Sequence, residues 1–403
     1  MKMITGGVTA AKGFTANGIH CGIRKSRVKR DLCLILSDRP ASSAAVYTSN
    51  LVKGAPLTVT KKNLENGVAR AVICNSGNAN TCNADGVEIA EKMCSLTADA
   101  LGIDPTDVIV ASTGVIGEPL SVEPIAAGMK ELVAGLGDHN DFAAEAIMTT
   151  DVKIKSFAVE FEIGGTTCRL GGIAKGSGMI HPNLATMLVF ITTDCSVSAS
   201  ALKAALSTDV QNTFNMISID GDTSTNDMVA VLANGASGSP LVTEDSEYFP
   251  EFMKALNSVT VALCRSIAAD GEGATKLLEC AVTGAKSEEC AKTAAKAVVC
   301  SSLTKAAMFG ADANWGRVLC AVGYSGAPVD PSKIGVTFSS RAGEVEVCRD
   351  GSGVPFSEGI AKAVLSEDEI TIKVDLGDGD FSATAWGCDL TYDYVKINGD
   401  YRT

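Results

Sequence analysis

Histidine, basic charge and long apolar runs are scarce in this chain of 403 residues, and each shortage narrows what the protein can do. A Ser-His-Asp or Cys-His mechanism would have to use one of only three histidines, His20, His139 and His181. The first two lie in surroundings typical of surface or loop residues, and His181 precedes Pro182, where we expect it to shape a turn. The shortage of histidine favours a nucleophile that carries its own base.

The charge balance and the lack of apolar runs limit the partners of the protein. The formal net charge is -13 at pH 7, which argues against nucleic acid or an anionic membrane as a partner. No apolar stretch approaches the roughly 20 residues that span a bilayer. The N-terminus has neither the apolar core of a signal peptide nor an Arg/Ser-rich transit character. We therefore expect a cytoplasmic protein with no membrane contact and no nucleic-acid partner.

Motifs for phosphate, metal and cofactor binding are also missing. The stretch GGIAKGSG at 171–178 lacks the order of a phosphate loop, and the chain has no GxSxG elbow and no dinucleotide fingerprint. The 14 cysteines are scattered, without a CxxC pair or a Cys/His cluster at ligand spacing. We expect no metal and no cofactor, and most cysteines to be reduced, small residues of the core. A cysteine-rich redox or metal-binding protein is the non-enzymatic alternative.

The order of predicted elements indicates the fold class. Apolar spacing predicts helices over 87–101, 122–136 and 199–214, with Ser121 as N-cap and Pro124 in the first turn of the second. Alternation predicts a strand over 152–163, and two glycines then turn the chain into a strand over 166–170. Strands and helices are mixed rather than strictly alternating, which predicts a layered α+β architecture instead of a doubly wound sheet.

A change in composition near residue 285 predicts a second domain. Residues 287–308 are rich in alanine and lysine and have helical spacing, and short strands are predicted at 336–338, 344–348, 370–376 and 381–386. A chain of this length is long enough for two domains. We predict a larger domain over residues 1–285 and a smaller α/β domain over residues 286–403.

The most informative segment is GGIAKGSGMIHPNLATMLVFITTD at 171–194, in which a glycine-rich loop leads to Ala185, Thr186 and an apolar run. Cleavage of the Ala185–Thr186 bond would leave Thr186 with a hydroxyl nucleophile and a free α-amine. An α-amine titrates near pH ~8 and can serve as a base at neutral pH. The alternative is a loop that leads into a buried strand, with Thr186 favoured there by its β-propensity.

This segment resembles the self-cleavage signature of the ornithine acetyltransferase family, also called glutamate N-acetyltransferase or ArgJ. The likeness continues along almost the whole chain, in the motifs GGVTA (6–10), NSGNAN (75–80), STGVIG (112–117), MTTD (148–151), GDTSTND (221–227), DGEGATK (270–276) and INGDYRT (397–403). Gly399 departs from the family, which more often has alanine there. The resemblance implies an αββα sandwich, self-cleaved between Ala185 and Thr186, and a smaller domain whose C-terminal tail returns to the active site.

The resemblance also implies the reaction. The family belongs to arginine biosynthesis and moves the acetyl group from N2-acetyl-L-ornithine to L-glutamate by a ping-pong scheme, here through an acetyl-Thr186 intermediate. Acetyl-CoA is a further donor in bifunctional members, and the sequence does not decide this point. The α and β chains are expected to assemble as an α2β2 heterotetramer. The alternative is a self-cleaving β-peptidyl aminopeptidase or amidase of the same fold, but those relatives use a serine nucleophile and resemble this chain less.

The family places an oxyanion hole at the Thr-Gly pair of the STG motif, which here is the Thr113 hydroxyl and the Gly114 backbone N–H. Such fixed donors stabilise the charge of a tetrahedral intermediate. Without the resemblance, the STG motif would be interpreted as a turn.

Residues that contact substrate are likewise implied by the resemblance. Lys175 suits a carboxylate, and Glu272 suits the side-chain ammonium of ornithine. Taken alone, Lys175 would be a solvated loop lysine and Glu272 part of a polar turn. The remaining expected contacts are Asn398 and Thr403 in the tail and either Thr149 or Thr150, between which spacing does not decide.

Overall fold

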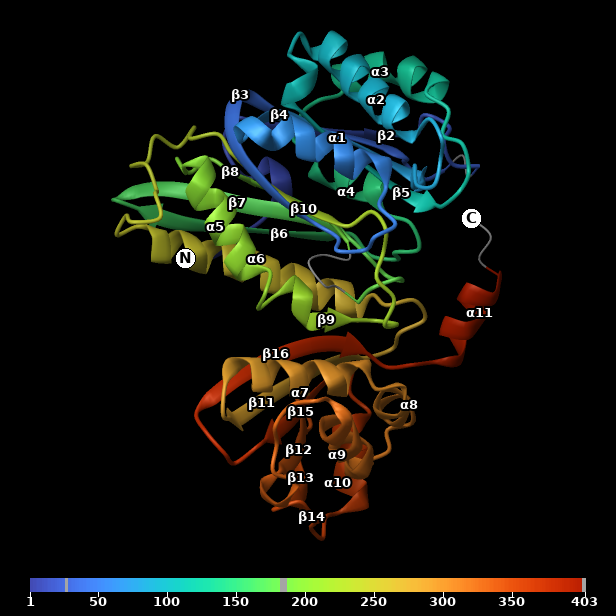
Figure 1. Cartoon of the computed structure of the whole chain (residues 1–403), viewed down its shortest axis with the longest axis vertical. Coiled ribbons are helices and arrows are strands. Elements are labelled where there is room, and N and C mark those ends of the chain that lie inside the picture. The colour runs from blue at the N-terminus through green and yellow to red at the C-terminus, as the bar shows by residue number, and fades with distance from the viewer. Residues whose placement is uncertain (26–27, 182–186, 401–403) are drawn as a thin grey trace.

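A computed structural model describes residues 1–25, 28–181 and 187–400. These residues form a nine-stranded sheet and a seven-stranded sheet, each with helices packed against it (Figure 1). The α+β class predicted from the mixed order of elements is confirmed. No helix in these three ranges is long and apolar enough to cross a membrane.

The first sheet has the order β1-β6-β7-β8-β10-β3-β4-β5, and β2 pairs with β3. The neighbours β8/β10 and β4/β5 are parallel, and the other pairs are antiparallel. Its strands are β1 (Lys2–Ile4), β2 (Phe14–Ile19), β3 (Leu32–Tyr47), β4 (Val68–Asn78), β5 (Val108–Val115), β6 (Lys155–Ile163), β7 (Thr166–Lys175), β8 (Leu188–Thr193) and β10 (Met228–Ala233).

The first sheet bends back on itself at the long strand β3. Its pairing with β4 shifts between Leu36 and Ala41, and only the part after this irregularity pairs with β10. A bulge bends a strand and increases its twist. One apolar cluster accordingly combines Ile35 and Val72 from one half of the sheet with Phe190 and Leu232 from the other half. The two halves therefore pack face to face across a shared core.

Helices cover the outer faces of the two halves. The helices α1 (Ala55–Asn63), α2 (Gly86–Leu101) and α3 (Glu123–Ala134) lie over the half with β4 and β5, whereas α5 (Ala199–Asp209) and α6 (Phe249–Ala269) cover the other half (Figure 1). The short helix α4 (Asn140–Ile147) contacts strands of both halves. The layers therefore follow the αββα order that the resemblance implied.

The second sheet has the order β14-β13-β12-β15-β11-β16-β9. Its elements are β9 (Ile217–Ser218), β11 (Leu277–Ala285), β12 (Gly335–Ser340), β13 (Gly343–Arg349), β14 (Ser352–Gly353), β15 (Glu369–Asp375) and β16 (Phe381–Cys388), with helices α7 (Glu288–Cys300), α8 (Ser302–Gly310), α9 (Trp315–Tyr324) and α10 (Glu358–Leu365). The strands predicted at 336–338, 344–348, 370–376 and 381–386 correspond to β12, β13, β15 and β16. The division after residue 285 stays a prediction; β11, which precedes it, pairs within this second sheet.

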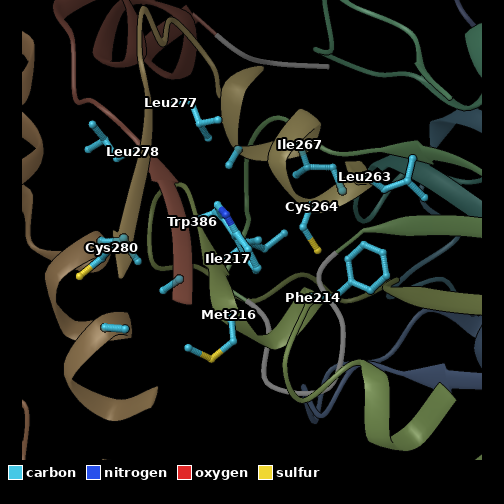
Figure 2. Close-up of a cluster of buried hydrophobic side chains, with 14 of the residues drawn as sticks. Phe214, Met216, Ile217, Leu263, Cys264, Ile267, Leu277, Leu278, Cys280 and Trp386 are labelled. Carbon is cyan, nitrogen blue, oxygen red and sulfur yellow. The ribbon is translucent and has the colours of Figure 1, made fainter. Parts of the chain in front are cut away.

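One core joins the two sheets. Figure 2 shows Cys264 and Ile267 of α6 beside Ile217 of β9 and Trp386 of β16. Strand β9 comes from the first part of the chain and pairs in parallel with β16, so Trp386 lies opposite Ile217. The final helix α11 (Tyr392–Asp400) follows β16 and runs from the second sheet toward the first (Figure 1). Because the sheets share a core, the path of α11 is fixed relative to the first sheet.

Several predicted boundaries are wrong. The predicted strand over 152–163 begins only at Lys155, because the backbone N–H groups of Val152 and Lys153 donate to a carboxylate instead of a strand. The predicted helix over 287–308 is split at Ser301, which has an extended backbone and whose hydroxyl caps α8. The predicted N-cap Ser121 lies one residue before the actual N-cap Val122, and its hydroxyl still accepts the N–H of Glu123.

Candidate active site

Four segments that are distant in the sequence meet around a small cavity of about 20 Å³, which we call the central cavity. They are the end of β5, the end of β7 with the loop that follows, the residues that lead into β8, and the turn before β10. The residues that line the central cavity are Thr113, Lys175, Gly178, Met179, Ile180, Met187, Leu188, Ser224, Asn226 and Asp227. The predicted residues Thr113 and Lys175 are therefore brought together.

The predicted cleavage residues Ala185 and Thr186 and the predicted tail residue Thr403 lie outside the described residues. Met187 is the first described residue after that segment, and it is buried at the wall of the central cavity. Its carbonyl accepts the N–H of Met228, the first residue of β10. This hydrogen bond fixes the entry to β8 beside the entry to β10.

The Thr-Gly pair of the STG motif lies in an irregular part of the parallel ladder between β4 and β5. Gly114 has φ of 134°, and a Cβ atom there would lie 2.3 Å from the carbonyl carbon of Gly77. Only glycine fits this position, because the conformation and the close approach both exclude a side chain. Asn78 pairs with Thr113 and with Val115, which marks a bulge. Bulges of this kind re-aim side chains next to active sites, and the Thr113 side chain here lines the central cavity.

Asn226 ties the motifs of the site together, a role that the sequence reasoning did not assign. Its side-chain N–H2 donates to the carbonyls of Ala79, at 2.5 Å, and Ser112, at 3.0 Å. Its side-chain oxygen accepts hydroxyl protons from Thr81 and Thr225, both at 2.6 Å. Asn226 is buried, so each of these bonds replaces one that water would otherwise make. The motif GDTSTND could have indicated this connecting role of Asn226, because it contains more polar residues than a turn requires.

Asp227 is a second residue to which no role was assigned. Its side chain is buried, it lines the central cavity, and its Oδ2 has no hydrogen-bond partner among the described residues. Burial raises the pKa of this carboxyl well above its usual range, although a hydrogen bond from Ser224 and the charge of Lys175 act in the opposite direction. The neutral carboxyl is therefore favoured inside the site.

Lys175 is the last residue of β7, and its half-buried side chain brings a positive charge to the central cavity. It forms no ion pair within the described part of the chain. The next residue, Gly176, donates its N–H to Asp151 Oδ1 at 2.7 Å. Burial would raise the pKa of Asp151, but the charges of Lys155 and Lys175 outweigh it and hold the pKa far below the usual range.

Two of the other predicted substrate residues, Thr150 and Glu272, line a larger cavity of about 480 Å³, which we call the tail cavity. Thr150, Lys153, Glu272 and Lys396 are among the residues that line it. Of the pair that spacing did not separate, Thr150 lines this cavity, whereas the N–H of Thr149 donates to Asp151 at 3.0 Å.

The final helix brings Asn398 to Glu272. The side-chain N–H2 of Asn398 donates to Glu272 Oε2 at 2.7 Å, across 126 residues of sequence. Helix α11 packs closely on the turn that carries Glu272, since a Cβ atom at Gly273 would lie 2.7 Å from the backbone nitrogen of Tyr394. A Cβ atom at Gly178 would lie 2.5 Å from the Glu272 carboxylate, and Gly178 also lines the central cavity. Glu272 therefore lies between the two cavities.

None of the three histidines is among the described residues that line the central cavity, although His181 directly follows the lining residue Ile180. His181 contacts the hydroxyl of Ser218 at 3.1 Å and the thiol of Cys300 at 3.5 Å, and its carbonyl accepts a hydrogen bond from Thr223. Burial, followed by the charge of Lys296, lowers the pKa of His181. Ten of the 14 cysteines are buried, which agrees with their predicted place in the core.

Comparisons with known proteins cover the whole chain. The ArgJ family profile matches residues 15–403. The arginine biosynthesis bifunctional protein ArgJ of Symbiobacterium thermophilum is 51% identical over 406 residues, covering 100% of both chains. The protein of the same name from Bacillus subtilis is 49% identical over 99% of this chain and 97% of its own length. The crystal structure of the bifunctional protein argJ from Bacillus halodurans is 44% identical, with a TM-score of 0.50, and the match covers 53% of this chain and 98% of that chain.

Proposed function

This chain belongs to the ArgJ family, and from that premise we propose how its residues carry out acetyl transfer. Its full-length likeness is to bifunctional ArgJ proteins of arginine biosynthesis. It is accordingly an ornithine acetyltransferase and a glutamate N-acetyltransferase. The acetyl group moves from N2-acetyl-L-ornithine to L-glutamate, and acetyl-CoA is the second donor that a bifunctional enzyme accepts.

The first proposed step is self-cleavage between Ala185 and Thr186. The Thr186 hydroxyl attacks the carbonyl carbon of Ala185, the peptide nitrogen leaves as the new α-amine, and water hydrolyses the resulting ester. The products are an α chain of residues 1–185 and a β chain of residues 186–403. The match to the solved Bacillus halodurans chain supports this, because 98% of that chain covers 53% of this one, and residues 186–403 are 218 of 403, about 54%.

In the proposed transfer reaction, the α-amine of Thr186 accepts the proton of the Thr186 hydroxyl, which attacks the acetyl carbon of N2-acetylornithine. Ornithine leaves, and the α-amine of glutamate then takes the acetyl group from the Thr186 ester. This division into two half-reactions is the advantage of covalent catalysis. Support for a nucleophile that supplies its own base comes from the described lining of the central cavity, which includes no histidine side chain.

Each half-reaction passes through an oxyanion. We assign the Thr113 hydroxyl and the Gly114 N–H as its donors. The single observation that carries the proposal is that Thr113, at the bulge of the STG motif, and Met187, the residue that follows the cleavage segment, line one cavity. A donor that is fixed before the reaction stabilises the developing charge without reorganisation.

The substrate is proposed to lie along the loop between the two cavities. Lys175 receives the α-carboxylate in the central cavity, and Glu272 receives the ornithine ammonium. Thr150 in the tail cavity and Asn398, which donates to Glu272, supply neutral polar groups, and Thr403 is assigned to the same end of the substrate. The support is geometric, because Lys175 and Gly178 line the central cavity and Glu272 lies against Gly178.

The experiment that tests this function combines mass and activity. Denaturing mass spectrometry of the purified protein should give two fragments that meet at Ala185 and Thr186. Incubation with N2-acetylornithine and glutamate should then form N-acetylglutamate and ornithine in equal amounts. An enzyme that is active as one intact chain would contradict the proposed self-cleavage. Hydrolysis of the substrate without acetyl transfer would instead support an aminopeptidase or amidase.

Assembly and location are separate proposals. We assign an α2β2 heterotetramer in the cytoplasm, which light scattering on the cleaved enzyme and cell fractionation would test. A mass equal to one α and one β chain would overturn the tetramer.

A further inference from the structure

A buried lysine joins segments that lead to the proposed substrate residues. Lys155 is the first residue of β6, and its side chain is fully buried. Its ammonium lies 2.7 Å from Asp151 Oδ1 and 2.6 Å from Asp270 Oδ2. Both carboxylates are themselves buried, at 1% and 4% exposure. One cation therefore stands between two anions that water does not reach.

Each carboxylate leads to a different part of the site. Asp151 accepts the N–H of Gly176, the residue that follows Lys175. Asp270 accepts the N–H groups of Val152 and Lys153. The carbonyl of Asp270 accepts the Ser177 hydroxyl at 2.6 Å, and the carbonyl of Ser177 accepts the N–H of Glu272 at 2.8 Å.

The charges around Lys175 decide whether it is available to a substrate. Asp151 and Asp227 are the two carboxyl groups whose pKa values the Lys175 charge lowers. Burial favours the neutral form of Asp227, which therefore competes little for the Lys175 ammonium. Asp151 is ionised, but Lys155 lies between it and Asp270 as a close cationic partner.

We propose that Lys155 is a positioning residue for acetyl transfer, which keeps Lys175 free for the substrate carboxylate by neutralising Asp151. This inference rests on the proposed contact between Lys175 and substrate. Without Lys155, the Asp151 carboxylate would have Lys175 as its remaining cation and would draw it out of the central cavity. Both N2-acetylornithine and glutamate carry an α-carboxylate, so both should bind more weakly.

The test compares two double variants with the same change in charge. Lys155→Met should raise the KM for both substrates by about 10-fold to 100-fold, the cost of one lost charge-assisted contact, with a smaller change in kcat. Adding Asp151→Asn removes the carboxylate that captures Lys175, so K155M/D151N should recover most of the lost affinity. Adding Asp270→Asn relieves the same buried repulsion but leaves Asp151 ionised, so K155M/D270N should keep the high KM.

The two double variants keep the test decisive even where Lys155→Met alone does not fold. A KM at least about tenfold lower for K155M/D151N than for K155M/D270N, at equal melting temperatures, supports the proposal. Equal KM values for the two would overturn it and leave Lys155 a purely structural residue. The control is Lys276→Met, because the Lys276 ammonium donates to the carbonyls of Met308 and Leu365, and neither residue lines either cavity. It should lower the melting temperature and leave KM unchanged.

A further variant separates failure of this inference from failure of the proposed function. Lys175→Met should raise the KM for both substrates. If Lys175→Met raises KM and Lys155→Met does not, the positioning role of Lys155 is wrong and the proposed function stands. If Lys175→Met leaves KM unchanged, both the positioning role of Lys155 and the proposed contact between Lys175 and the substrate carboxylate are wrong.

Discussion

Replacing Glu272 by glutamine tests how the enzyme recognises ornithine, because it removes one charge and almost nothing else. The glutamine side chain has the same length, and its oxygen can still accept the hydrogen bond from Asn398 that now ends on Glu272 Oε2 at 2.7 Å. The close approach of Gly178 to this side chain leaves no room for a longer one. The variant therefore keeps the packing of helix α11 and changes only the electrostatic attraction to an ammonium.

The size of the effect follows from the surroundings of Glu272. A hydrogen bond that involves a charged group is worth about 1.5–3 kcal/mol. Glu272 is half-buried rather than buried, so solvent screens part of this energy and the lower end applies. We expect kcat/KM for N2-acetylornithine to fall about tenfold, since about 1.4 kcal/mol corresponds to a factor of ten.

The assay uses the two acetyl donors of a bifunctional enzyme. With N2-acetylornithine the loss should appear in full, whereas with acetyl-CoA and glutamate no ornithine ammonium is present and kcat/KM for acetyl-CoA should change little. The melting temperature must match that of the wild type. Equal losses with both donors would refute the reasoning and indicate that Glu272 shapes the site or moves a proton. Full activity with N2-acetylornithine would show that another group holds the ammonium.

Three other changes give equally definite expectations. Thr186→Ala should stay a single chain and lose all transfer, whereas the wild type should give fragments of roughly 19 and 22 kDa by denaturing mass spectrometry; two fragments from the variant would show cleavage without the threonine. Thr113→Ala should slow both self-cleavage and acetyl transfer by a factor of about 10²–10³, the usual cost of losing one oxyanion donor. Unchanged rates in both reactions would show that Thr113 is not an oxyanion donor. Asp227→Asn should raise the melting temperature relative to the wild type by an amount that grows as pH rises above about 4, because the carboxyl then ionises in the unfolded chain while burial keeps it neutral in the folded protein. A difference between variant and wild type that does not change from pH 4.5 to pH 8 would contradict this.

Local patterns in the sequence predicted most elements of the fold, because each depends on residues close together. The two glycines that predicted a turn into a strand over 166–170 precede β7, which begins at Thr166 and continues to Lys175, and the helical spacing over 87–101 corresponds to α2 with a difference of one residue at its start. Errors arose where a distant group intervened. The first residues of the predicted strand at 152–163 donate to Asp270, more than 110 residues away, and the periodicity of the strand cannot report that.

The site was predictable in its parts but not in its connections. Motifs indicated Thr113, Lys175, Glu272 and Asn398, yet the bond between Asn398 and Glu272 joins residues 126 positions apart. The buried pair of Lys155 with Asp270 spans 115 positions. Nothing near Lys155 in the sequence sets it apart from the exposed Lys153, so its burial emerges only when β6, β7 and the end of α6 come together.

The arrangement of charges bears on how a chain with a net charge of -13 can bind substrates that carry carboxylates. Among the described residues that line the central cavity Lys175 is the one cation; burial favours the neutral form of Asp227, and the nearby Asp151 is paired with Lys155. The tail cavity contains both signs, since Lys153 and Lys396 line it together with Glu272. Ornithine and glutamate differ in the charge at the end of the side chain, and a cavity of one sign would reject one of them by leaving a charge unpaired. If the substrates bind as proposed, a mixed lining would let the ammonium of the leaving amino acid and the carboxylate of the accepting one occupy the same space in turn, as a ping-pong reaction requires.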